Sequence, residues 1–302
     1  MSHDHGHGAA NRTRLAIALA ITGTVLVAEV VGGLISGSLA LLADAGHMAS
    51  DVIGLVIALV ASLVATRPAT ARHTFGFQRF EVLGALLNGL LLIGVAVFVA
   101  IEAIRRLVEP ADHEVSSLPM LTVAVVGLGA NVVSLLVLRG GDRESLNLRG
   151  AYLEVLGDLI GSILALAAGV VILLSGWMPA DAVASLLVAA LIVPRALLLL
   201  RDVVRVLLES TPHDTDVEQI REHIRDTEGV VAVHDVHVWS ITSGSRVFTA
   251  HVVVDDEIFE RGETGAMLDR LGGCLHGHFD VEHSTFQLEP AGHADREEHA
   301  HR

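Results

Sequence analysis

Two pairs of ionisable residues lie one helical turn apart inside stretches of sequence that are otherwise apolar. His47 and Asp51 form the first pair, and Glu154 and Asp158 form the second. The i, i+4 spacing places both members of a pair on one face of a helix. A charge at the centre of a bilayer costs at least ~2.5–3.5 kcal/mol, so residues of this kind are functional candidates. Together the pairs offer one imidazole and three carboxylates, which predicts a four-coordinate site for a divalent cation.

The alternative is that these acids only join helices, as hydrogen-bonding groups or as members of buried ion pairs. Neither of the two apolar segments offers an arginine at matching depth. Carboxylates without a partner need a proton or a cation when they are removed from water. We therefore interpret both pairs as cation or proton sites.

Asp44 lies one turn before His47 and has two possible roles. It could be a proton partner or an acceptor that orients the ligands, or it could cap its helix near the outer interface. On the other segment, Gly157 and Gly161 form a small-xxx-small pattern that allows helices to approach closely. Close approach could bring both pairs into one coordination sphere, whose bonds would be about 2.0–2.2 Å long.

The elements that must position these residues are membrane helices. The 302 residues are 52% hydrophobic with a mean hydropathy of +0.57, which is typical of polytopic membrane proteins. A spanning helix needs about 20 mostly apolar residues. Six stretches qualify, namely 15–35, 39–64, 82–107, 118–138, 151–174 and 180–200. Arginines in alternate loops predict that both termini are cytoplasmic. We therefore predict a His-rich cytosolic tail over residues 1–14 and a transmembrane domain over residues 15–208.

The composition changes after the sixth stretch. A helix at 220–228, strands at 231–241 and 246–254, a mostly helical segment at 258–278 and a strand at 285–288 predict an α+β domain over residues 209–290. Residues 213–302 hold nineteen acids and seven arginines, which gives −12 of the chain's −15 and is unsuited to nucleic acid. The single cysteine, Cys274, excludes an intrachain disulfide and a cysteine-based zinc site. Residues 291–302 are charged and predicted to be disordered.

Four motifs in order resemble the cation diffusion facilitator family, and in particular its zinc-transporting bacterial branch. They lie at residues 42–51, 73–81, 147–158 and 236–239. The resemblance implies six transmembrane helices plus a cytosolic ferredoxin-like domain, assembled as a homodimer in the inner membrane. It also implies export of divalent metal from the cytoplasm in exchange for protons. The transport-site residues would then be His47, Asp51, Glu154 and Asp158.

Two departures from the family pattern concern metal identity. Zinc-transporting members usually have histidine where this chain has Glu154. A carboxylate also binds zinc, but exchanging nitrogen for oxygen makes the site harder, so zinc, manganese, iron, cobalt and cadmium all remain candidates. Some members build a peripheral site in the loop between helices two and three. Only His73 matches there, beside Thr70 and Phe77, and we expect no such site.

The resemblance also implies a regulatory metal site in the cytosolic domain. His237, His251 and His283 match positions where relatives bind zinc, Glu289 matches a fourth, and His234 matches an alternative ligand position. Each of these histidines could instead be a surface or packing residue. The histidines near the termini could raise the local metal concentration or be solvated; they are His3, His5, His7, His293, His299 and His301.

The sequence thus predicts a proton-coupled metal exporter that works by alternating access, with divalent ions, protons, lipid and a second copy as its partners. A metal-selective channel would share the ligands but would not couple to protons. A membrane metal sensor would depend on the cytosolic domain and show no flux. An intramembrane metalloprotease is disfavoured because the chain has no His-Glu-x-x-His motif, so we do not expect an enzyme.

Overall fold

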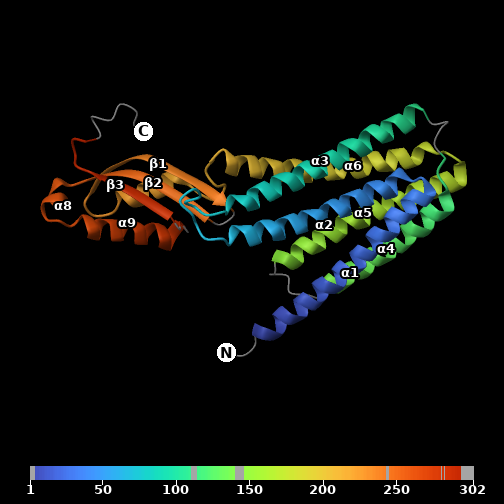
Figure 1. The fold of residues 1–302 in the computed structure, drawn as a ribbon, viewed down its shortest axis with the longest axis horizontal. Helices are drawn as coiled ribbons and strands as arrows, with labels where there is room; N and C mark the ends of the chain where they lie inside the picture. Colours follow the sequence, from blue (N-terminus) through green and yellow to red (C-terminus); the bar gives the residue numbers. More distant parts are fainter. Residues whose placement is uncertain are drawn as a thin grey trace. The chain divides into compact units, whose positions relative to one another are not determined.

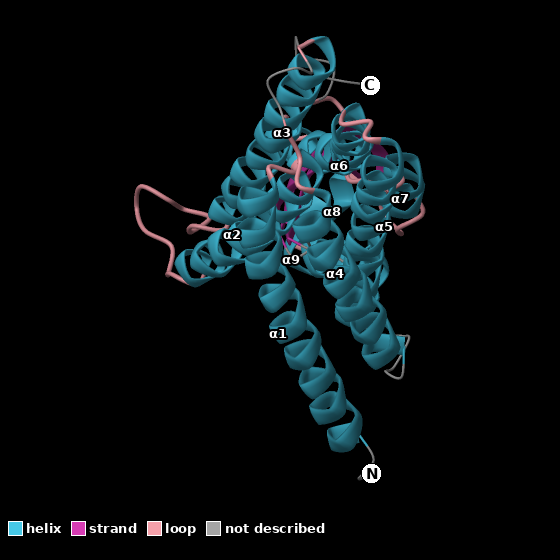
Figure 2. Ribbon diagram, turned by 90° about the vertical axis from the view of Figure 1, so that its right-hand side faces the viewer, coloured by secondary structure: helices cyan, strands magenta, loops and turns pink. Residues whose placement is uncertain are grey.

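Helices dominate the computed structural model, which describes residues 4–109, 114–139, 146–242, 245–279, 281 and 283–293 (Figure 2). The long helices are α1 (Asp4–Ser36), α2 (Leu39–Ala65), α3 (Arg79–Val108), α4 (Ser117–Arg139), α5 (Leu146–Ser175) and α6 (Pro179–Leu207) (Figure 1). Among the described residues, six helices are long and apolar enough to cross a membrane. The predicted set of six spans is therefore confirmed.

Small residues make up much of the contact surface inside the bundle. Helix α1 packs along α4, and α4 packs along α5 (Figure 1). One buried cluster joins α2 to α4, α5 and α6, and its alanines are Ala40, Ala124, Ala165, Ala168, Ala180 and Ala184. In lipid, apolar surface gives little drive for helices to associate, so close van der Waals packing between small side chains has to supply it.

The start of α2 is held by a carboxylate from the start of α6. Asp181 is 1% exposed and accepts hydrogen bonds from Ser38 Oγ at 2.5 Å, Leu39 N at 2.7 Å and Ala40 N at 3.2 Å. These amides belong to the unsatisfied first turn of α2, where the helix dipole favours a negative charge. Arg106 of α3 lies 3.4 Å from the same carboxylate. The contact fixes α2, which carries His47 and Asp51, against α3 and α6.

The C-terminal domain has the predicted α-β-β-α-β order. It comprises α7 (Val217–Arg225), β1 (Val230–Thr242), β2 (Ser245–Val254), α8 (Asp256–Glu260), α9 (Thr264–Phe279) and β3 (His283–Glu289). The segment predicted as mostly helical contains two helices, because Gly262 between them adopts a φ of 68° that a helix interior does not allow. The sheet order is β1-β2-β3, with β1 antiparallel and β3 parallel to β2.

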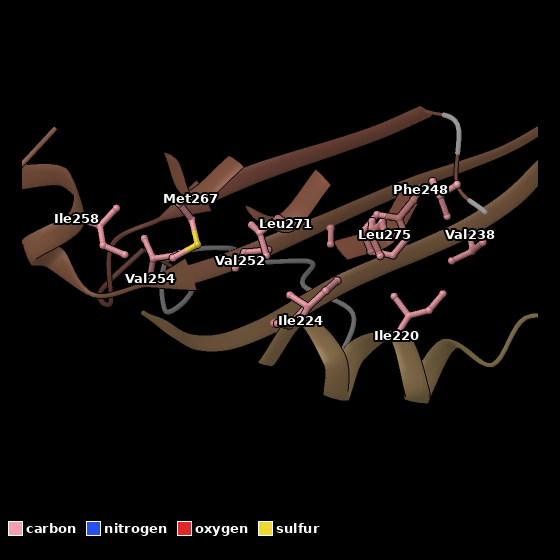
Figure 3. Close-up of a cluster of buried hydrophobic side chains, with 13 residues drawn as sticks. Ile220, Ile224, Val238, Phe248, Val252, Val254, Ile258, Met267, Leu271 and Leu275 are labelled. Carbon is pink, nitrogen blue, oxygen red and sulfur yellow. The ribbon is translucent and has the colours of Figure 1, made fainter. Parts of the chain in front are cut away.

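A compact apolar core lies between the sheet and its helices. Figure 3 shows Ile220 and Ile224 pointing from α7 toward the strands, where Phe248 of β2 is also fully buried. Helix α9 contributes Met267, Leu271 and Leu275, each 0% exposed. Their spacing of four residues places them on one face of α9, so the helix covers the sheet while it carries the chain over to the parallel strand β3.

The chain divides into two compact units, residues 1–57 with 87–199, and residues 58–86 with 200–302. The second unit therefore contains the C-terminal domain and one end each of α2, α3 and α6. Inside this unit, Arg79 pairs with Glu209 at 2.7 Å, and Thr242 Oγ1 donates to Glu81 Oε2 at 2.9 Å. The loop that joins α2 to α3 is thus attached to the C-terminal domain.

Candidate metal sites

The first predicted pair is formed as the helical spacing requires. His47 Nε2 lies 3.5 Å from Asp51 Oδ2, and the two side chains are only 9% and 11% exposed. Both residues belong to the middle of α2, where the neighbouring Ala43, Ala45 and Met48 are buried as well. The pair therefore faces the interior of the bundle, away from the lipid-facing side.

The second pair lies on α5 and meets the first. The carboxyl groups of Asp51 and Glu154 lie close enough to act electrostatically on each other. Asp158 is 1% exposed, and neither of its carboxylate oxygens has a hydrogen-bond partner among the described residues. Three neighbouring buried carboxyl groups require a proton or a cation to offset their repulsion. The arrangement is chemically suited to exchanging one for the other.

The transport-site residues do not close into a full coordination sphere. Within the described residues, one group of three potential ligands has all its donor atoms within 4.8 Å of one another, and that group lies in the C-terminal domain. The candidate ligands on α2 and α5 do not form such a group, and metal bonds of about 2.0–2.2 Å require donor atoms that lie close together. Binding a cation here would have to draw the side chains of α2 and α5 closer together.

An arginine from a third helix reaches these acids, although the two helices that carry the pairs offer none at matching depth. Arg195 Nη1 of α6 lies 3.8 Å from Asp51 Oδ2. The sequence argument compared depths only along the two helices that carry the pairs. An arginine side chain is long enough to reach from a neighbouring helix, and Arg195, which follows Pro194 in an apolar run, was a visible signal.

Asp44 belongs to a second buried carboxyl pair and does not cap α2, since Asp181 supplies that cap. Its side chain is 2% exposed and lies close enough to the carboxyl group of Glu29 on α1, which is 1% exposed, for the two groups to interact electrostatically. The sequence analysis missed Glu29, although an acid inside an apolar stretch was the signal that identified Asp51. Glu29 was not identified as a candidate because no second ionisable residue lies one turn from it on α1.

Two glycines make room for this carboxyl pair. A Cβ atom on Gly161 would lie 2.6 Å from Asp44 Cγ, and one on Gly127 would lie 3.2 Å from Glu29 Oε1. In contrast, a Cβ on Gly157 would meet nothing within 4 Å. Gly161 therefore has a more specific role than general helix packing, because it admits a carboxylate beside Asp158.

The C-terminal domain holds a histidine cluster, formed by His234, His251 and Glu289. Glu289 is 1% exposed, with one oxygen 3.1 Å from His234 Nε2 and the other 2.8 Å from His251 Nδ1. Two imidazoles and a carboxylate are common zinc ligands, and a water or a residue from a second chain could complete four-coordination. Burial raises the pKa of the Cys274 thiol, which disfavours the thiolate that a metal would need.

The strand register explains which predicted ligands meet. His234 on β1 lies directly opposite His251 on β2, and His251 lies opposite Gln287 on β3. Glu289 is two residues beyond Gln287 and so points to the same face of the sheet. His237 lies beyond an irregularity in β1 and opposes Thr249. His237 and His283 are exposed and do not belong to the histidine cluster.

The predicted terminal histidines are only partly covered by the structure. His3, His299 and His301 lie outside the described residues, and for His5 and His7 only the helical backbone of α1 is described. His293 lies in a turn that follows β3.

Comparison with known proteins decides the family. The family model described as "Cation efflux transmembrane domain" matches residues 15–208, and "Cation efflux protein, cytoplasmic domain" matches residues 212–291. The chain belongs to the cation efflux family. This confirms the resemblance to the cation diffusion facilitators that the four motifs indicated.

Curated relatives of this cation efflux chain match it over nearly its whole length. The metal cation efflux system protein CzcD of Cupriavidus metallidurans is 43% identical, over 98% of this chain and 93% of its own. The cadmium, cobalt and zinc/H(+)-K(+) antiporter of Bacillus subtilis is 40% identical, over 97% and 93%. The zinc transporter ZitB of Escherichia coli is 40% identical, over 96% and 93%.

Proposed function

We propose that this chain exports a divalent transition metal, zinc foremost, from the cytoplasm in exchange for protons. The observation that carries the proposal is the meeting of three carboxylates and one imidazole from α2 and α5 inside an apolar bundle. Relatives named for zinc transport and for cadmium, cobalt and zinc antiport support it. Because Glu154 stands in this set, cadmium, cobalt, iron and manganese are the alternative cargoes.

The proposed exchange follows from what the ligands must do to bind metal. Asp51 and Glu154 can lie close together inside the bundle only when a proton or a cation offsets their charges. A divalent cation that arrives from one side displaces that proton, because ligands bind metal in their deprotonated form. When the site opens to the other side, a proton returns to the carboxyl pair or to His47 and the metal leaves. An inward proton gradient then drives the metal outward.

We further propose how the chain sits in the membrane and which part does what. The arginine bias supports a topology with both termini in the cytoplasm and with residues 15–208 crossing the inner membrane. Residues 209–290 would form the cytosolic domain that pairs two chains and tunes transport through the histidine cluster. The loop attachments of Arg79 to Glu209 and of Glu81 to Thr242 offer a path from that domain to α3.

Metal flux in proteoliposomes tests the proposal. Purified protein is reconstituted with a zinc indicator inside the vesicles, and uptake is started with and without an imposed pH gradient. We expect zinc uptake that rises when the lumen is more acidic than the outside, and that is lost in Asp51→Asn and Asp158→Asn. Asp202→Asn is the matched control, because Asp202 is 58% exposed and its ion pair is with the adjacent Arg201.

A membrane metal sensor is the second candidate, because the histidine cluster is preassembled. A sensor would bind zinc in the C-terminal domain but show no flux under any gradient. Zinc binding without transport in correctly inserted wild-type protein would contradict the exporter and favour the sensor. Flux that is independent of the pH gradient would favour a channel.

A further inference from the structure

The charges of the transport-site residues do not balance a divalent cation. With His47 neutral, Asp51, Glu154 and Asp158 carry three negative charges, and a divalent cation leaves one of them uncompensated. An uncompensated charge inside a membrane bundle is costly. We propose that Arg195 is the fifth functional residue of this site, a tethered cation that neutralises the metal-loaded state and occupies Asp51 when metal is absent. The inference rests on the proposed function and adds a charge rule to it.

Geometry places Arg195 where this role requires it. Its guanidinium lies 3.8 Å from Asp51 Oδ2, the same oxygen that faces His47 at 3.5 Å. Its charge also acts electrostatically on His47, Glu154 and Asp158, and Asp158 feels it least among its neighbouring charges. Arginine is always protonated in proteins, so the compensating charge is permanent.

The exposed fractions of the Asp51 and Arg195 side chains are consistent with an arginine side chain that can move. Asp51 is 11% exposed, whereas the side chain of Arg195 is 51% exposed. The guanidinium therefore reaches a buried carboxylate from a half-open position and is not locked there by packing. When a divalent cation binds Asp51, the arginine can withdraw by a rotamer change while its charge stays close enough to balance the site.

An ordinary interfacial arginine is the alternative role. Arg201, six residues further along α6, shows what such a residue looks like: it is 54% exposed and its ion pair is with the adjacent Asp202. Arg195 differs because its ion pair reaches across to another helix and to a predicted ligand. Arg201 therefore serves as the matched control.

The charge rule predicts a specific pattern among variants. Arg195→Gln leaves the zinc-loaded site at −1, and Glu154→Gln leaves it at +1. The double variant returns the loaded site to neutrality while keeping an oxygen ligand at position 154. Each single change should therefore lower the initial rate of zinc uptake at least about tenfold, and the double variant should recover to within about threefold of wild type. Arg195→Lys should retain most of the rate, and Arg201→Gln should match wild type.

A trivalent probe separates charge balance from a merely structural role. With Arg195→Gln, three carboxylates face the cation, and a terbium ion neutralises them completely. Terbium should therefore inhibit zinc uptake by this variant at concentrations at least tenfold lower than for wild type, and at higher concentrations for Glu154→Gln. A change in folding or helix packing alone would not reverse the order of preference between trivalent and divalent ions.

The outcomes are distinct from those that test the exporter itself. Independent, additive losses in the two single variants, or an unchanged terbium preference in Arg195→Gln, would overturn the role of Arg195 even if wild-type protein transports zinc. If wild-type protein binds zinc without flux, the exporter fails. Terbium competition for zinc bound to the purified full-length variants then still decides whether Arg195 balances the site.

Discussion

At the residue scale, Gly161 shows how narrowly the bundle accommodates its charged groups. The carboxylate of Asp44 occupies the space that any side chain at position 161 would need. The same helix carries Gly157, where a methyl group would meet nothing within 4 Å. One small-xxx-small pattern therefore contains two glycines with different roles, one specific and one permissive.

Gly161→Ala should impair both stability and transport. The added methyl must displace the Asp44 carboxylate or separate α2 from α5, and overpacking of this kind costs about 1–3 kcal/mol. Thermal unfolding of the purified protein and zinc flux measure the two effects. Gly157→Ala should behave like wild type in both assays, and equal effects of the two substitutions would contradict the specific role of Gly161.

Metal preference should also be decided at single residues. In the Arg195→Gln background, Glu154→His restores a second imidazole without leaving an excess positive charge. Imidazole suits zinc, whereas oxygen ligands suit manganese. The ratio of initial zinc to manganese uptake should therefore rise at least several-fold relative to the Arg195→Gln, Glu154→Gln protein. An unchanged ratio would remove Glu154 from the residues that select the metal.

At the scale of elements, the position of α2 depends on a cap that comes from a different helix. Asp181 satisfies the first backbone amides of α2 and pairs with Arg106 of α3. Three helices are thus joined at one buried carboxylate. Because α2 carries His47 and Asp51, this junction helps to fix the position of that candidate ligand pair.

Asp181→Ala should destabilise the protein by about 1.5–3 kcal/mol, since hydrogen bonds to a charged group contribute on that order. Thermal unfolding in detergent should show the loss as a lower melting temperature. Asp202→Ala removes an exposed acid from the same helix and should change stability by less than about 0.5 kcal/mol. A melting temperature unaffected by Asp181→Ala would show that the junction does not hold α2.

At the scale of the whole molecule, the predicted division is between a membrane unit that exchanges ions and a C-terminal domain that responds to metal. Each part has its own core and its own set of candidate ligands, and the loop between α2 and α3 belongs to the same compact unit as the C-terminal domain. The arrangement suits a transporter whose activity follows the metal concentration on the side of that domain.

Replacing His234 and His251 together by alanine should lower the zinc bound by the full-length protein by one ion per chain. Flux should persist with an altered dependence on zinc concentration, because the histidine cluster and the proposed transport-site residues belong to different compact units. Zinc binding at the cluster should weaken at acidic pH, since a protonated imidazole cannot ligate. His237→Ala should leave the stoichiometry unchanged. Loss of all flux in a well-folded double variant would refute a tuning role for the cluster.

Local sequence was sufficient to determine the six helices, the order of elements in the C-terminal domain, and the pairs His47–Asp51 and Glu154–Asp158. These features depend on composition and on the period of one helix or strand, both of which are written along the chain. Tertiary structure alone decided that Arg195 reaches Asp51, that Glu29 meets Asp44, and that His234 rather than His237 joins His251 and Glu289. Those contacts depend on how each helix is rotated against its neighbours and on the register of each strand. Rotation and register are fixed by packing between residues far apart in sequence, which no single segment encodes.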